Sequence, residues 1–101
     1  MRNAQDAYEQ ARYENALVWL DAVADDLADM DRPTRARYFY LRGMAEHRLG
    51  RDREARHDLA LARELGGGTT KILPDDWRRN MERVLADLEL PGKETENGRR
   101  E

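Results

Sequence analysis

The 101-residue chain has no cysteine, three prolines and few aromatic residues, and each scarcity narrows what the protein can be. Without cysteine, neither a disulfide framework nor a thiolate metal site can form, so packing alone must hold the fold. No apolar run reaches the ~18 residues that a membrane-spanning helix needs, and no apolar signal core follows the first residues. We therefore expect one small domain without a membrane span. The compartment stays open: a cysteine-free chain suits the cytoplasm by default, and a mature exported protein would have the same composition.

Charged residues are plentiful, at 39% of the chain, but they are not of one sign. The net charge of −3 divides into −6 over residues 1–31, +5 over residues 32–63 and −2 over the remainder. A negative total argues against nucleic acid as a partner. The distribution predicts solvated helix faces; the alternative is an acidic first hairpin and a basic second one that attract each other or a charged partner.

Turn signals and helical periodicity divide the chain into five predicted helices. Ala, Leu, Arg and Glu are abundant and favour helix. Breaks fall near residues 31–34, 50–52, 66–70 and 91–92, and apolar residues recur between them at helical spacing. We predict an all-α fold with helices near residues 3–11, 14–30, 35–49, 52–65 and 75–89, in one domain over residues 1–90. A disordered tail is expected over residues 91–101, and the short connections predict stacked antiparallel helix hairpins.

The central hairpin carries a spaced pattern of large and small residues. Phe39 is followed four residues later by Gly43, and Ala55 is followed four residues later by Leu59, with Gly50 at the turn between them. Small residues let two helix backbones approach closely, and the large side chains fill the space beside them. The pattern resembles a tetratricopeptide repeat.

Partial copies of this pattern flank the central hairpin. Ala16 lies 39 residues before Ala55, and Trp77 lies 38 residues after Phe39. The family period is about 34, so each junction carries a few additional residues. The resemblance implies about two and a half tetratricopeptide-like repeats, with the helix over 75–89 as a C-terminal cap. The departures from the family pattern are Arg42, Glu46, Asp52 and Gly67.

The resemblance also implies a shallow concave groove, lined by the first helix of each repeat, that holds a peptide or a partner helix. Tyr, Met and Arg are enriched at protein interfaces. For Tyr40 and Met44 the alternative is that both are core residues packed against the first helix. Carried over by position, the groove residues are Gln5 and Tyr8 from the first helix, Arg37, Tyr40, Leu41, Met44 and His47 from the middle unit, and Arg78, Glu82 and Leu85 from the last helix.

No residue pattern indicates catalysis, a cofactor or a metal. His47 and His57 are the two histidines, and their ten-residue separation gives no metal-ligand spacing. The acids of residues 25–31 lack the alternation of a calcium loop, and the glycines of residues 66–68 lack the Gly-Lys-Thr order of a phosphate loop. We predict a non-enzymatic protein-protein interaction module, a monomer or weak homo-oligomer, for a peptide with acidic and apolar residues. The alternative is an assembly subunit, or a fragment of a longer repeat array, that self-associates.

Overall fold

The structure is a computed structural model that describes residues 1–66 and 72–89, and this part of the chain is 83% helix without strands. The all-α prediction is therefore confirmed, whereas the predicted disordered tail lies outside the described residues. The helices in chain order are α1 (Arg2–Glu9), α2 (Tyr13–Ala22), the 3₁₀ helix η1 (Ala24–Asp29), α3 (Arg32–Arg48), α4 (Asp52–Gly66) and α5 (Asp75–Leu88).

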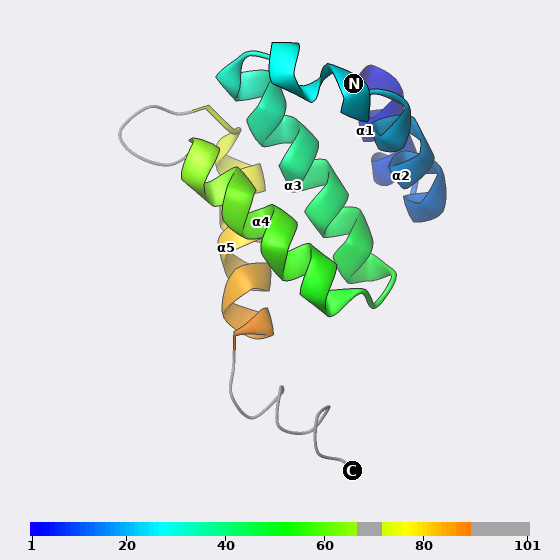
Figure 1. Cartoon of the computed structure of the whole chain (residues 1–101). Coiled ribbons are helices and arrows are strands. Elements are labelled where there is room, and N and C mark those ends of the chain that lie inside the picture. The colour runs from blue at the N-terminus through cyan, green and yellow to red at the C-terminus, as the bar shows by residue number, and fades with distance from the viewer. Residues whose placement is uncertain (67–71, 90–101) are drawn as a thin grey trace.

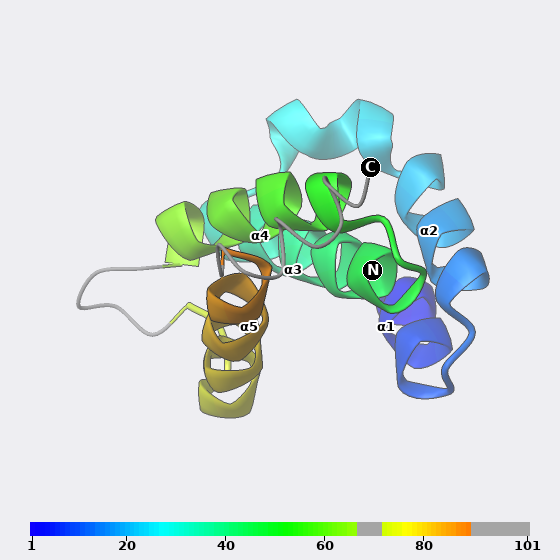
Figure 2. The ribbon, with the colours of Figure 1, turned by 90° about the horizontal axis from the view of Figure 1, so that it is seen from below.

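Helix α3 lies at the centre of the molecule. It packs along α4 in a hairpin and also contacts α1, α2 and α5 (Figure 1). The α1–α2 hairpin lies at one end of this arrangement. Figure 2 shows α1 and α5 on the same side of the α3–α4 hairpin, separated from each other. Because neighbours cover α3 on more than one side, its buried residues follow no single stripe.

The start of α3 differs from the prediction by three residues. The helix begins at Arg32 rather than Arg35, because the Asp31 carboxylate accepts a 2.9 Å hydrogen bond from the Thr34 backbone N–H and caps it. Pro33 lies in the first turn, where its missing N–H costs no helical hydrogen bond. The hydrogen bond from Thr34 also lowers the pKa of Asp31.

Two residues with left-handed backbone end helices. Gly50 has a φ of 80° and stops α3, and the next N–H, that of Arg51, donates to the carbonyl oxygen of Glu46 at 2.8 Å. Ala11 has a φ of 63° between α1 and α2, where the N–H of Arg12 donates to the carbonyl oxygen of Ala7 at 2.8 Å. Glycine tolerates this backbone and alanine does not, so the α1–α2 turn is strained.

The single helix predicted over residues 14–30 is wrong. α2 stops at Ala22, and a 3₁₀ helix follows from Ala24 to Asp29. A 3₁₀ helix has three residues per turn, so Ala24, Leu27 and Met30 fall on one face. All three are half-buried, while the residues between them are exposed, and Leu27 and Met30 pack against the core. The tighter helix therefore keeps the apolar side chains inward.

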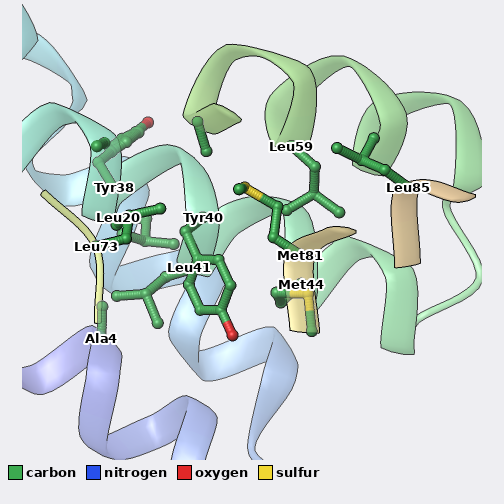
Figure 3. Packing of buried hydrophobic residues seen from close by; sticks show 12 residues of the cluster. Ala4, Leu20, Tyr38, Tyr40, Leu41, Met44, Leu59, Leu73, Met81 and Leu85 are labelled. Carbon is green, nitrogen blue, oxygen red and sulfur yellow. The ribbon is translucent and has the colours of Figure 1, made fainter. Parts of the chain in front are cut away.

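The core is built around α3. Gly43 lets α4 approach, since a Cβ on Gly43 would lie 2.6 Å from Leu59 Cγ. The Tyr40 ring stacks on Trp77 of α5, with centroids 4.5 Å apart. Figure 3 shows Tyr40 among the other buried side chains. The buried core residues are Ala4, Leu20, Ala36, Tyr38, Tyr40, Leu41, Met44, Leu59, Ala62, Leu73, Met81 and Leu85.

Candidate interaction groove

An open depression of about 630 Å³ lies between α1, α3 and α5, and we call it the groove. Its walls are the two helices that lie on the same side of the central hairpin in Figure 2. Apolar, aromatic and charged side chains all contribute to it. The lining residues are Tyr8 from α1, Met44, His47 and Arg48 from α3, and Asn80, Arg83, Val84, Ala86 and Asp87 from α5.

The floor of the groove is apolar and fixed from below. Met44 is 3% exposed, so it presents a small area to the groove while most of its side chain packs in the core. Beneath the α5 side, the buried Tyr40 ring stacks on Trp77. Burial raises the pKa of the Tyr40 hydroxyl to about 12, and this hydroxyl is hydrogen-bonded to the Asn80 side chain. The floor is therefore a rigid surface with one adaptable methionine.

The wall on the α1 side holds an arginine between two tyrosines. The guanidinium of Arg48 lies over the Tyr13 ring, 5.9 Å from its centroid. Arg48 is also hydrogen-bonded to the Tyr8 hydroxyl, whose pKa is raised mainly by burial. A cation held over an aromatic face loses little further freedom on binding. Arg48 is thus positioned as an exposed, partly ordered positive charge at the groove.

The wall on the α5 side carries a second arginine. The Arg83 Nη2 atom donates to Asn80 Oδ1 at 2.6 Å, and Asn80 in turn contacts Tyr40. Half-buried Val84 lies beside them and adds apolar surface. Asp87 contributes the one carboxylate among the groove residues, and this residue is not without an interaction partner. The two arginines and the apolar surface together suit a ligand that is both acidic and apolar.

His47 contributes an imidazole nitrogen with unused hydrogen-bonding capacity. It lines the groove from α3, and its buried Nδ1 has no hydrogen-bond partner among the described residues. A buried polar atom without a partner costs free energy, which a ligand group could recover. Among residues 1–66 and 72–89 there is no group of three or more His, Cys, Asp or Glu that could hold a metal ion.

Of the residues carried over from the repeat pattern, Tyr8, Met44 and His47 line the groove. Tyr40 and Leu41 are 2% and 0% exposed, so the structure corrects their assignment from groove lining to core. For Tyr40 the core alternative holds, and Met44 combines both roles. Leu85 is likewise a core residue.

The other carried-over residues lie away from the groove lining. Arg37 is half-buried and is not among the residues that line the groove. Gln5 donates to Glu9, Arg78 donates to Asp75, and Glu82 accepts from Arg63 of α4. The groove assignments on α5 are wrong for a geometric reason. Successive helical residues are about 100° apart, so residues 78, 82 and 85 lie on roughly the opposite side of α5 from residues 80, 83, 84 and 87.

The sequence reasoning missed Arg48 and the α5 lining residues. Asn80, Val84 and Asp87 follow the i, i+4, i+7 spacing of one helix face, so the sequence alone indicated that they share a face. Which face of α5 turns toward α1 depends on the connection after Gly66 and on the stacking of Trp77 against Tyr40. Neither is set by the repeat period.

A second feature is a cluster of charged residues buried between α3 and α4. Glu46 and Asp58 are 3% and 6% exposed. Arg42 Nε lies 3.3 Å from Glu46 Oε2 and 3.2 Å from Asp58 Oδ2, and its Nη1 lies 3.0 Å from Asp21 Oδ1 on α2. The same Nη1 donates to the Tyr38 hydroxyl at 3.1 Å. We call Arg42, Glu46 and Asp58 the buried charge cluster.

One arginine cannot neutralise two buried carboxylates, and the protonation of Glu46 reflects this. Burial raises the pKa of Glu46 to about 8, reinforced by a hydrogen bond and repulsion from Asp58 and opposed by Arg42. Glu46 is therefore protonated at neutral pH and donates toward Asp58. Beside the cluster, Arg53, Glu54 and His57 complete the lining of a smaller depression of about 360 Å³. The protonation of this cluster is therefore sensitive to pH.

Comparisons with known proteins identified no relative of this chain. Neither a protein-family model, nor a curated protein, nor a solved structure matches the chain. Within the described ranges, no helix is long and apolar enough to cross a membrane. Functional inference therefore rests on the groove and on the surfaces around it.

Proposed function

We propose that the chain is a non-enzymatic protein-protein interaction module of tetratricopeptide-repeat type, whose groove binds a peptide or partner helix carrying acidic and apolar residues. The observation that carries this proposal is the groove between α1, α3 and α5. Its apolar floor lies between two arginines, Arg48 of α3 on the α1 side and Arg83 of α5. A groove lined by alternate helices of stacked hairpins is the surface that repeat proteins use for recognition.

The groove chemistry defines the ligand. Apolar side chains of the ligand would cover Met44 and Val84, which contributes most of the favourable free energy. Carboxylates would lie beside Arg48 and Arg83, where they set orientation and speed the encounter. The groove is shallow, so we expect weak, salt-sensitive binding rather than tight capture.

The test uses two synthetic peptides with the same leucines, one with glutamates between them and one with lysines. Titration of each into isotope-labelled protein is followed by amide NMR shifts and by fluorescence anisotropy. We expect the glutamate peptide to shift the signals of the groove residues and the lysine peptide to leave them unchanged. Added salt is expected to weaken the binding.

Charge reversal separates recognition from folding. Arg48→Glu combined with Arg83→Glu should weaken glutamate-peptide binding by about tenfold or more, because both carboxylate partners become repulsive. Arg51→Glu, at an exposed residue of the α3–α4 turn, is the matched control and should bind normally. Equal shifts of the groove signals by the two peptides, or unchanged glutamate-peptide binding by the double variant, would contradict the proposal.

A further inference from the structure

Two adjacent large apolar side chains lie exposed on α2. Val18 is 65% exposed and Trp19 is 47% exposed, and they are the exposed large hydrophobic residues of the part of the chain that the structure describes. Leu20, the next residue, is fully buried, so α2 is apolar on both its inner and its outer side. An apolar pair on the outer side of a helix whose inner side is already buried is a candidate contact surface. Tryptophan is also among the residues that contribute most to binding at protein interfaces.

The surroundings of this pair are strongly acidic. Residues 12–29 carry five carboxylates against one arginine, a net charge of −4, and all five acids are exposed. Glu14 lies one helical turn before Val18, and Asp25 lies shortly beyond the end of α2. Trp19 also borders a hollow of about 180 Å³ whose other lining residues are Asn3, Asp6, Ala7, Gln10, Arg12 and Asn15. The outer surface of α2 thus combines an apolar centre with an acidic rim.

We propose that the outer face of α2 is a second docking surface, which binds a partner protein through an amphipathic helix with an apolar ridge flanked by lysine or arginine. The ridge covers Val18 and Trp19, and the flanking cations face Glu14 and the acids of η1. This is the interface pattern of an apolar centre with a complementary polar rim. The surface is opposite in charge to the groove, so one module would hold an acidic ligand and a basic partner on different helices.

The acidic residues around Val18 and Trp19 disfavour a second copy of this chain as the partner on this surface. In a two-fold symmetric contact through α2, the exposed acids of one copy, among them Glu14 and Asp25, would face the acids of the other copy, which costs free energy. A head-to-tail contact would need a complementary apolar patch elsewhere. The described residues expose no large hydrophobic side chains besides Val18 and Trp19. An anionic membrane surface is disfavoured by the same acids.

The experiment uses the indole N–H signals of the full chain. Trp19 is exposed, while Trp77 is half-buried against Tyr40, so the two indoles report on different sites. The probes are two synthetic helical peptides with the same leucine ridge, flanked by lysines in one and by glutamates in the other. We expect the lysine peptide to shift the Trp19 indole signal and leave Trp77 in place, with weaker binding at high salt.

Variants at exposed positions keep the fold and test the surface. Val18→Ala combined with Trp19→Ala should weaken lysine-peptide binding by about tenfold or more, because it removes the apolar centre. Asp25→Asn combined with Asp26→Asn should weaken binding and reduce its salt dependence. Glu64→Gln, at an exposed carboxylate of α4, is the matched control and should change neither.

Three results would overturn the proposal. The first is a glutamate peptide that shifts the Trp19 indole signal as much as the lysine peptide does, since charge would then play no role at this surface. The second is lysine-peptide binding that shifts groove signals instead of Trp19, which would assign the peptide to the groove. The third is a Trp19 signal that moves with the concentration of the protein alone, together with concentration-dependent sedimentation, which would make a second copy the occupant. The groove test with the glutamate peptide is independent of all three.

Discussion

Replacing Glu46 with glutamine should remove most of the alkaline sensitivity of the α3–α4 hairpin. The folded-state pKa of Glu46 is raised to about 8 from an ordinary value of 4.5, so the folded chain keeps a proton that the unfolded chain loses. The stabilisation is therefore complete below about pH 4.5 and is lost as the pH rises toward 8. In the variant Glu46→Gln, the new side chain would resemble the protonated acid, because its amide donates toward Asp58 while its oxygen accepts from Arg42.

The magnitude follows from the size of the pKa shift. Each pH unit between the unfolded and folded pKa values changes the free energy of unfolding by about 1.4 kcal/mol per group. Between pH 5 and pH 8, Glu46 alone therefore lowers the stability of the wild-type chain by about 3 kcal/mol. For a domain with about 5–10 kcal/mol of total stability, this is a large fraction. The Glu46→Gln variant should be close to wild type at pH 5 and clearly more stable at pH 8.

Urea unfolding followed by circular dichroism at pH 5, 6.5 and 8 measures this effect. His57 lines the depression beside the cluster, so His57→Gln is a second control. Glu64→Gln, at an exposed carboxylate, is the matched control and should follow the wild-type pH dependence. Parallel pH dependences for wild type and Glu46→Gln would refute the reasoning, because they would show that Glu46 ionises alike in the folded and unfolded chains.

Other substitutions test the packing. Gly43→Ala should lose about 1–3 kcal/mol despite its better helix propensity, because its Cβ would lie 2.6 Å from Leu59 Cγ; urea unfolding should show a smaller loss in a Leu59→Ala background. Ala11→Gly should gain about 0.5–1 kcal/mol by relieving the left-handed backbone, seen as a higher urea midpoint, and a lower midpoint would contradict the strain. In thermal unfolding, Tyr40→Phe should cost about 1 kcal/mol, because it loses the hydrogen bond to Asn80, and Tyr40→Ala should cost about 3–5 kcal/mol, because it also loses the ring. Similar losses in the two variants would show that the hydroxyl, and not the ring, accounts for the cost.

Periodicity and turn residues were sufficient to predict most of the helices. The breaks at Asp31 and Gly50 are local, since capping and left-handed glycine act within a few residues. The stretch after Ala22 could not be assigned in this way. Its apolar residues Ala24, Leu27 and Met30 fit a 3.6-residue period nearly as well as a 3-residue one, and only packing against the core favours the 3₁₀ helix.

The groove was less predictable than the helices, for a geometric reason. A residue lines a groove only if its helix is rotated to bring it there, and that rotation is set by contacts distant in sequence. Tyr40 and Trp77 lie 37 residues apart in the chain and fix how α5 faces α3. Position within a repeat therefore indicated Met44 and His47, which do line the groove from α3, but it indicated the wrong face of α5.

Arg42 and Glu46 depart from the repeat pattern, and both departures are explained by Asp58 of α4, which the pattern does not include. Arg42 and Glu46 are four residues apart on α3, so their pairing was visible in the sequence. Asp58 joins them from α4 only once the hairpin forms. A buried charge that loses its partner costs far more than the intact pair contributes, so Arg42 and Asp58 are expected to change together. Met44, His47 and Arg48 lie on roughly the opposite side of the same helix, where they face the groove. Helix α3 thus has polar residues on two sides: one side completes the buried charge cluster, and the other lines the groove that we propose as a binding surface.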